Sequence, residues 1–164
     1  MNKENKLVPG LPSGFEDRWD KKLLLKKKLL KAIENNFIKF GAEALETPSF
    51  EISENIGSFL AEDDSNPMSD VFSFQDGEKS ITLRYDLSSP LARFVAQNNQ
   101  ELPSIYKRYQ IQNVFRNEKA GNGRYREFLQ ADFDIVGNVN PAQANAELCN
   151  LISSTLSDCG LNKD

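Results

Sequence analysis

The chain has 164 residues, of which 39% are hydrophobic and 27% are charged, and its formal net charge at pH 7 is −4. This length and composition predict one soluble globular domain with its own core, and the net negative charge argues against a protein that coats nucleic acid non-specifically. Histidine is absent, which excludes histidine general bases, Ser-His and Cys-His triads and histidine metal sites from this chain. The two cysteines, Cys149 and Cys159, do not form a CxxC pair, and we expect two reduced, largely structural thiols.

Neither a membrane span nor a secretion signal is predicted. No apolar run approaches the roughly 18 residues that a spanning helix needs, and the N-terminal residues MNKENKLVPG lack a hydrophobic signal core. The sequence therefore predicts a cytoplasmic protein.

The N-terminal third is predicted to be a lead-in followed by a long helix. Residues 1–14 contain two proline and two glycine positions near their end and predict a flexible segment with turns. Residues 15–40 have a helical pattern, since Leu29, Ile33, Phe37 and Phe40 recur every three or four positions. Lysines fill the remaining positions and predict a solvated helix face. Gly41 fits the end of this helix.

Short strands are predicted next. Residues 42–47 predict a strand that Pro48 closes, residues 50–60 a short helix or turn, and residues 61–70 an acidic loop. Residues 71–75 and 79–86 predict a hairpin around the turn signature Asp76-Gly77. The second hairpin strand ends with Arg84 and Asp86 on its polar side.

Two further helices complete the predicted elements. Ser88 or Ser89 can cap a helix that has Pro90 at its first position and runs to about Asn98. Asn140-Pro141 starts a last helix over 141–159, and Gly160 ends it. Because helices and strands are segregated, the fold class is predicted to be α+β, with helices flanking an antiparallel β-sheet.

The stretch from Tyr109 to Gly137 is the most informative part of the chain. It predicts two strands joined by a loop rich in glycine and charge, each strand having one apolar face and one face of amides and charges. One interpretation is a sheet that presents its polar face to water. The other is a binding site, because arginine, glutamine and short carboxylates suit fixed bidentate contacts to phosphate and carboxylate groups.

The motifs in this stretch resemble those of the histidyl-tRNA synthetase family of class II aminoacyl-tRNA synthetases. Val114-Phe115-Arg116-Asn117-Glu118, followed by Gly123-Arg124-Tyr125-Arg126-Glu127-Phe128-Leu129-Gln130, is similar to motif 2 in its histidyl form. Residues 40–51 resemble motif 1, and Leu83-Arg84-Tyr85-Asp86-Leu87-Ser88 resembles the segment that receives the amino acid's ammonium group. The resemblance covers roughly residues 8–160 and implies part of a class II synthetase catalytic core.

The resemblance also implies roles for individual residues. Arg116 would be catalytic and would bind both the ATP α-phosphate and the carboxylate of histidine. The other ATP-binding residues would be Glu118, Arg124 and Phe128. The histidine-binding residues would be Asp86, Ser88, Gln130 and Asp134, with Asp134 facing the imidazole. Arg126 would support the loop or meet the acceptor end of the tRNA.

The implied ligands are histidine, ATP with Mg²⁺ on its phosphates, and tRNA(His). The family pattern also implies a homodimer formed through the motif 1 region near Pro48. Motif 3, the second catalytic arginine and the anticodon-binding domain are not visible. We therefore interpret residues 15–164 as the N-terminal part of a catalytic domain that is inactive alone.

Two other functions compete with this interpretation. One is the histidine-binding regulatory subunit of ATP phosphoribosyltransferase, a non-catalytic paralogue. The retained Arg116, Glu118 and Arg124 favour the enzyme, since a histidine sensor needs no ATP loop. The second competing function is that of a structural dimerisation module, whose charged face would only contact water. Surface ion pairs contribute about 0 to 1 kcal/mol each, which does not explain why so many charges are concentrated on one face.

Overall fold

A pair of long antiparallel strands forms the centre of the computed structural model, which describes residues 8–56 and 70–161. β5 (Ile105–Phe115) and β6 (Glu127–Gly137) pair along their whole length, and β1 (Glu43–Ala44) adds in parallel to the other edge of β5. This sheet has the order β1-β5-β6. The predicted strand pair is confirmed, although β5 begins at Ile105 and therefore four positions before Tyr109.

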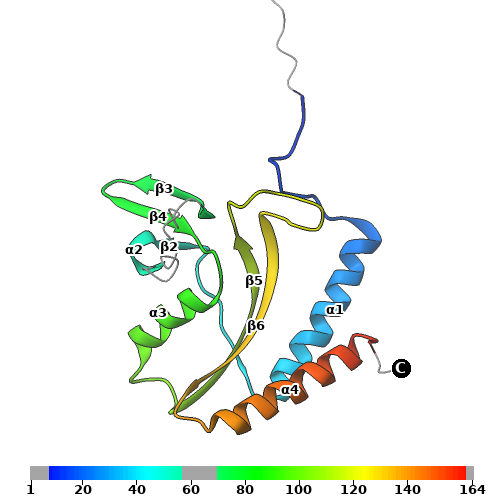
Figure 1. Ribbon diagram of the computed structural model, residues 1–164, viewed down its shortest axis with the longest axis vertical. Coiled ribbons are helices and arrows are strands. Elements are labelled where there is room, and N and C mark those ends of the chain that lie inside the picture. The colour runs from blue at the N-terminus through cyan, green and yellow to red at the C-terminus, as the bar shows by residue number, and fades with distance from the viewer. Residues whose placement is uncertain (1–7, 57–69, 162–164) are drawn as a thin grey trace, which may run out of the picture.

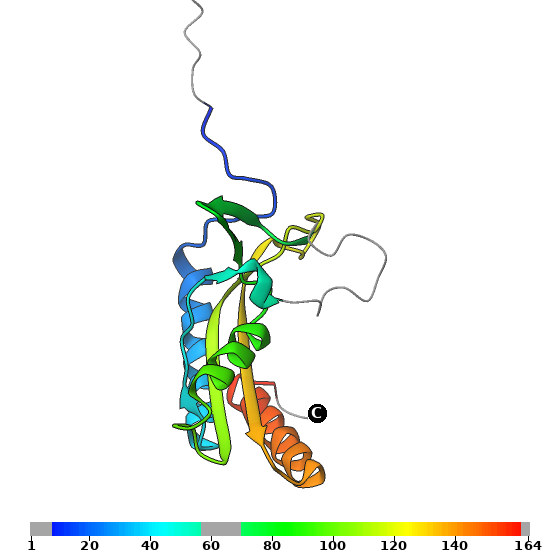
Figure 2. The ribbon, with the colours of Figure 1, turned by 90° about the vertical axis from the view of Figure 1, so that its left-hand side faces the viewer.

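Two helices cover one face of the long strands. α1 (Asp20–Lys39) and α4 (Pro141–Asp158) lie together on this side (Figures 1 and 2). The ring centre of Phe37 lies 5.7 Å from the ring centre of Tyr109 on β5 and 5.6 Å from the ring centre of Phe133 on β6. Leu151 of α4 closes this core, at 3% exposure. The apolar faces predicted for both strands therefore form the hydrophobic core with the two helices.

The other side of the long strands carries α3 (Ser88–Asn98) and a second, smaller sheet (Figures 1 and 2). That sheet is antiparallel and has the order β2-β4-β3, from β2 (Phe50–Ile52), β4 (Lys79–Leu83) and β3 (Ser73–Asp76). The turn Asp76-Gly77 joins β3 to β4, with Gly77 at φ +61°, so the hairpin is confirmed. A short helix, α2 (Ser53–Ile56), follows β2.

Several boundaries differ from the predicted ones. α1 begins at Asp20 instead of residue 15, because Phe15 turns toward the hairpin and its ring packs 6.2 Å from that of Phe72. β1 has two residues instead of six, because the chain leaves β5 after Leu45. The carbonyl oxygen of Thr47 accepts a hydrogen bond from the side chain of Arg84 instead of pairing with β5. The acidic loop predicted at 61–70 lies, except for Asp70, outside the described residues, as do residues 57–60.

The helix ends follow the predicted signals at three of four places, the exception being the start of α3. Gly41 follows α1 at φ +80°, and Gly160 follows α4 at φ +87°, a backbone region that glycine adopts without strain. The side chain of Asn140 accepts hydrogen bonds from the backbone N–H groups of Ala142 and Gln143, which caps α4. The arrangement of helices around a largely antiparallel sheet confirms the α+β class. Among the described residues, no helix combines the length and apolarity needed to cross a bilayer.

Candidate functional site

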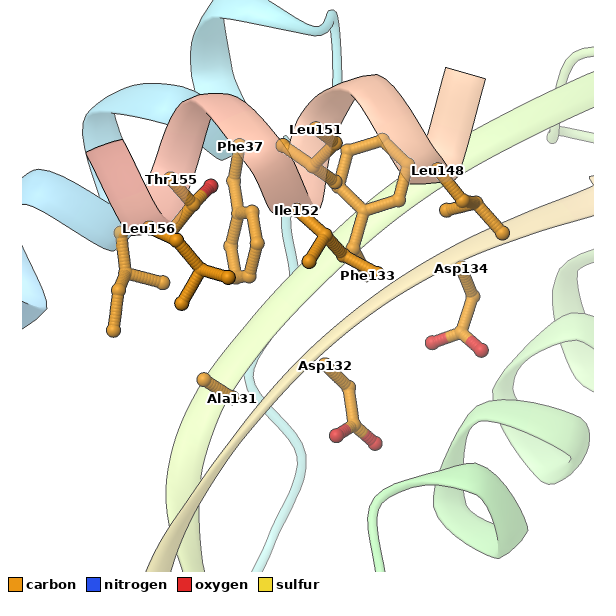
Figure 3. Close-up of a pocket in the computed structure, with 11 residues that line it drawn as sticks. Phe37, Ala131, Asp132, Phe133, Asp134, Leu148, Leu151, Ile152, Thr155 and Leu156 are labelled. Carbon is orange, nitrogen blue, oxygen red and sulfur yellow. The ribbon is translucent and has the colours of Figure 1, made fainter. Parts of the chain in front are cut away.

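The polar faces of β5 and β6 point to the same side of the sheet. Gln112 lies opposite Gln130, and Arg108 lies opposite Asp134, so each pair shares the face that is turned away from α4. Figure 3 shows Asp132 and Asp134 on one side of β6 and Phe133 with the α4 residues on the other. The strand pairing therefore brings two of the predicted histidine-binding residues, Gln130 and Asp134, onto one surface.

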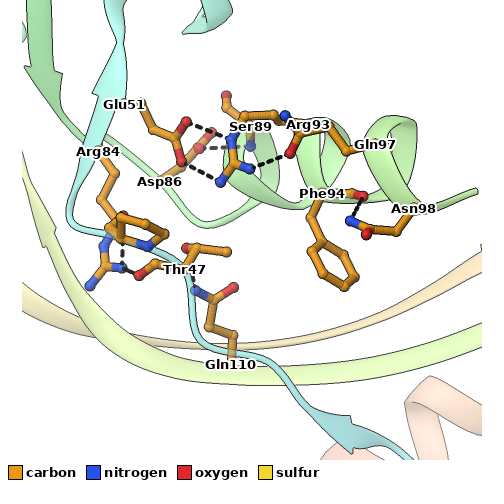
Figure 4. Close-up of polar contacts among 11 residues, drawn as sticks. Thr47, Glu51, Arg84, Asp86, Ser89, Arg93, Phe94, Gln97, Asn98 and Gln110 are labelled. Atoms are coloured by element: carbon orange, nitrogen blue, oxygen red, sulfur yellow. Dashed lines mark hydrogen bonds and ion pairs between the residues drawn. The ribbon is translucent and has the colours of Figure 1, made fainter.

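Much of this polar face is buried and not open to water. Arg108 is 0% exposed and Gln110 is 1% exposed. The amide of Gln110 donates to Thr47 Oγ1 at 2.8 Å, and Arg84 donates to Gln112 Oε1 at 2.9 Å (Figure 4 shows the Thr47 and Arg84 surroundings). The interpretation of a water-facing sheet is therefore wrong for the middle of β5, which has a packed polar layer beneath α3.

The segment that was predicted to receive an ammonium group lies beside this layer. β4 belongs to the second sheet, but its end is joined to β5 by a hydrogen bond of 3.0 Å from Phe115 N to Arg84 O. Asp86 follows and accepts a hydrogen bond of 3.0 Å from the backbone N–H of Ser89, which caps α3 (Figure 4). The predicted serine cap is wrong, because Asp86 supplies the cap from outside the helix. Ser88 is exposed in the first turn.

Arg116 lies between two aromatic rings at the end of β5. Its guanidinium carbon is 4.4 Å from the ring centre of Tyr85 and 5.1 Å from that of Phe128. Its Nε donates to the carbonyl of Tyr85 at 3.3 Å, and its backbone N–H donates to Arg126 O at 2.8 Å. These contacts hold the arginine in place, while a planar guanidinium can still form a two-point contact with phosphate or carboxylate.

The four predicted ATP-binding residues lie around one cavity. The cavity has a volume of about 290 Å³ and is lined by Arg116, Glu118, Gly123, Arg124, Tyr125 and Phe128. Its volume is close to the lower end of ligand pockets, about 300 Å³. An aromatic ring, two guanidinium groups and a carboxylate at one place are groups that can stack on a base and bind phosphates.

Glu118 connects the loop to the segment between β4 and α3. Its Oε1 accepts a hydrogen bond of 2.8 Å from the hydroxyl of Tyr85, and its Oε2 forms an ion pair with Arg124. The hydrogen bond from Tyr85, followed by that from Arg124, lowers the pKa of Glu118. Burial, with a contribution from Glu118, raises the pKa of Tyr85. Glu118 is therefore an acceptor at neutral pH, and the Arg124 side chain, 65% exposed, is open to an anionic ligand.

Arg126 lies under the loop. Its Nε donates to the carbonyl of Glu118 at 2.8 Å, and its guanidinium carbon is 5.8 Å from the ring centre of Phe72. Its backbone N–H donates to Gly14 O at 2.8 Å. Of the two roles considered for Arg126, these contacts favour support of the loop, and contact with tRNA stays a prediction.

Two polar residues of the site were not predicted. Arg108 continues the alternation of Gln110 and Gln112 toward the start of β5, but the predicted strand began one position too late to include it. Tyr85 precedes Asp86 and contacts both Arg116 and Glu118. The spacing of aromatic residues in a sequence does not distinguish one that lines a ligand cavity from one that packs in the core.

An apolar groove lies on the opposite face of the sheet. It has a volume of about 460 Å³ and lies between α1, α4 and β6 (Figure 3). Its side chains include Phe37, Phe133, Leu148 and Ile152. It belongs to the packing of the helices. Asp132 and Asp134 also line it, but their carboxylates point to the other side of β6 (Figure 3).

Known proteins are similar to this chain over nearly all of its length. The family model described as histidyl-tRNA synthetase matches residues 14–163. The chain is 84% identical, over its whole length, to the histidine–tRNA ligase of Pelagibacter ubique, and 45% identical over 93% of its length to that of Methylocella silvestris. It spans 35% and 30% of those two proteins, about a third of their length.

Two solved structures share the fold. An ATP phosphoribosyltransferase regulatory subunit/histidyl-tRNA synthetase from Bacillus halodurans superimposes with a TM-score of 0.79 at 25% identity, over 99% of this chain and 40% of its own. The histidyl-tRNA synthetase from Nostoc sp. PCC 7120 gives 0.76 at 26% identity, over 90% of this chain and 34% of its own. The fold is thus that of part of a class II catalytic domain.

Proposed function

The chain belongs to the histidyl-tRNA synthetase family, and we propose that it forms part of an enzyme that activates histidine with ATP and transfers it to tRNA(His). Since it spans about a third of the length of its curated relatives, the complete activity is proposed for the full-length protein. The observation that carries the proposal is Arg116. Its guanidinium lies between Tyr85 and Phe128, beside the Glu118–Arg124 pair.

The proposed activation step needs orientation and charge stabilisation more than a protein nucleophile. A carboxylate oxygen of histidine attacks the α-phosphorus of ATP, the bond to the bridging oxygen breaks, and pyrophosphate leaves with that electron pair. Negative charge is concentrated at the α-phosphate in the transition state, where Arg116 would bind both reactants. A chain without histidine residues can supply this chemistry.

The two substrates would bind on the same side of the β5–β6 pair. Phe128 would stack on adenine, Glu118 would accept from the adenine amino group, and Arg124 would leave Glu118 to bind the γ-phosphate. Asp86, Ser88 and Gln130 would bind the ammonium group of histidine, and Asp134 its imidazole. Mg²⁺ would be bound by the ATP phosphates.

The regulatory paralogue is the second candidate, because one of the similar structures carries that description in its name. A protein that only senses histidine has no use for the cavity around Arg116, Glu118 and Arg124. This cavity favours the synthetase. We also propose a cytoplasmic location, where tRNA is charged.

An exchange assay tests the proposed function. The full-length protein is expected to exchange pyrophosphate into ATP with histidine and not with other amino acids, whereas the 164-residue chain alone is expected to show at least about a hundredfold less exchange, since part of the site is missing. A full-length protein that fails to charge tRNA(His) but restores activity to a short-form ATP phosphoribosyltransferase would establish the regulatory function instead.

We further propose that the full-length protein is a homodimer and that the second sheet contributes to the interface. One face of this sheet is apolar and exposed, with Phe50 at 55%, Phe74 at 48% and Ile52 at 37%. The rings of Phe50 and Phe74 meet edge to face at 5.5 Å. The opposite face points inward, where Glu51 pairs with Arg93 of α3. A contiguous exposed apolar face next to Pro48 is typical of a protein interface.

The variant Phe74→Ser tests this interface. Sedimentation velocity of the full-length protein is expected to show a dimer for the unchanged protein and a shift toward monomer for the variant, because a large apolar side chain at an interface is replaced by a polar one. Gln75→Ser is the matched control, since Gln75 is the next residue of β3 and points to the other face. A Phe74→Ser protein that remains dimeric to the same extent would contradict the proposed interface.

A further inference from the structure

A continuous chain of polar contacts runs through the buried side of β5. Arg84 Nη1 and Gln110 Nε2 both donate to Gln112 Oε1, at 2.9 Å and 2.5 Å. Arg108 Nη1 in turn donates to Gln110 Oε1 at 3.2 Å. The chain therefore leads from the end of β4 to Arg108, which lies opposite Asp134 in the strand pairing.

Arg108 contacts both segments to which histidine binding is assigned. Its Nη2 donates to the carbonyl of Leu87 at 3.1 Å and lies 2.8 Å from Asp134 Oδ2. Leu87 is fully buried and is the residue between Asp86 and Ser88. One guanidinium thus joins the backbone of the ammonium-binding segment to the carboxylate assigned to the imidazole.

Packing alone does not account for an arginine at this position. Arg108 is 0% exposed, and its Nε has no hydrogen-bond partner among the described residues. Burying a charge is costly, and well-packed apolar residues often replace a buried ion pair without loss of stability. Because the side chain is fully buried, it is also not placed to contact a substrate itself. Its side chain contacts Leu87, Gln110 and Asp134 instead, which lie around the proposed histidine site.

We propose that Arg108 is a positioning residue for histidine, which holds Asp134 and the Asp86-Leu87-Ser88 segment in one fixed arrangement. This inference rests on the proposed function. Histidine would be bound at two ends, by its ammonium group and by its imidazole, so the distance between the two protein segments determines whether both contacts form. A small displacement between such groups has large kinetic effects.

The charges around Asp134 agree with this role. Burial raises the pKa of Asp134, the charge of Arg108 opposes the rise, and Asp132 on the same strand adds to it. Asp86, Asp132 and Asp134 all lie near Arg108, which is the cation among them. Removing that cation would raise the pKa of Asp134 further, so that Asp134 would become protonated, and lose its acceptor role, at a higher pH.

Kinetics of the full-length protein test the proposal with the variants Arg108→Gln and Arg108→Lys. For Arg108→Gln we expect the KM for histidine to rise about tenfold or more while the KM for ATP changes less than about twofold. The acid limb of kcat/KM for histidine is expected to move to higher pH. Arg108→Lys keeps the cation and is expected to restore the position of the acid limb and part of the histidine KM.

Arg93→Gln is the matched control. Arg93 forms a comparable ion pair with Glu51, at 2.7 Å and 2.8 Å, but contacts neither Asp134 nor Leu87 in the contacts described (Figure 4). The proposal would be overturned if the KM for histidine were unchanged in Arg108→Gln. It would also be overturned if the KM values for histidine and ATP rose by the same factor in Arg108→Gln, as in Arg93→Gln. If Arg108→Gln does not fold, Arg108→Lys decides, since a histidine KM and acid limb identical to those of the unchanged protein would overturn it. Failure of the unchanged protein to activate histidine would overturn the proposed function itself, and this inference with it.

Discussion

Replacing Arg116 with alanine in the full-length protein is expected to lower histidine-dependent ATP–pyrophosphate exchange by about a hundredfold to a thousandfold. The guanidinium is held by the carbonyl of Tyr85 and lies over the rings of Tyr85 and Phe128. The loss would come from the transition state, in which this group is proposed to bind the α-phosphate and the histidine carboxylate together. The measurement is the exchange rate at saturating ATP and histidine.

The variant Arg116→Lys separates charge from geometry. Lysine keeps the positive charge but lacks the planar fork, so exchange is expected to stay well below that of the unchanged protein. Circular dichroism should show both variants folded, because the side chain is only partly buried at the end of β5. If Arg116→Ala is folded and still binds ATP and histidine and exchanges normally, the charged face is structural and the enzymatic interpretation of this site fails.

Replacing Phe37 with alanine is expected to destabilise the chain by about 3 to 5 kcal/mol. Phe37 is 7% exposed and packs against Tyr109 of β5 and Phe133 of β6, so its ring joins α1 to both long strands. Removing the ring leaves a cavity between the helix and the sheet. The measurement is the free energy of unfolding of the 164-residue chain in urea, followed by circular dichroism.

The neighbouring variant Ile38→Ala is the control for this substitution. Ile38 lies on the same helix but is 52% exposed, and its replacement is expected to change the free energy of unfolding by no more than about 0.5 kcal/mol. A Phe37→Ala loss no larger than that of Ile38→Ala would show that α1 does not depend on this contact with the sheet.

Local pattern was sufficient to predict most of the helices and strands and some of the side chains that lie side by side. The alternation in residues 109–137 predicted which side chains share a strand face, and Phe133 and Asp134 do lie on opposite sides of β6. Asp76-Gly77 predicted the hairpin turn, and Asn140 predicted the start of α4. Arg116, Glu118, Arg124 and Phe128 are close in the chain and lie around one cavity because a strand pair and its loop bring them together.

Contacts between distant segments decided the remainder. The sequence by itself determined the period-two faces, the turn and the helix ends, since these depend on neighbouring residues. Only the tertiary structure decided that β4 lies in a separate sheet, that Asp86 caps α3, and that Arg108 is buried between Leu87 and Asp134. The physical reason is that alternation within a strand specifies only which of its residues share a face. Which segment packs on that face depends on residues far away in the chain, and that packing decides whether a charge on the face is buried.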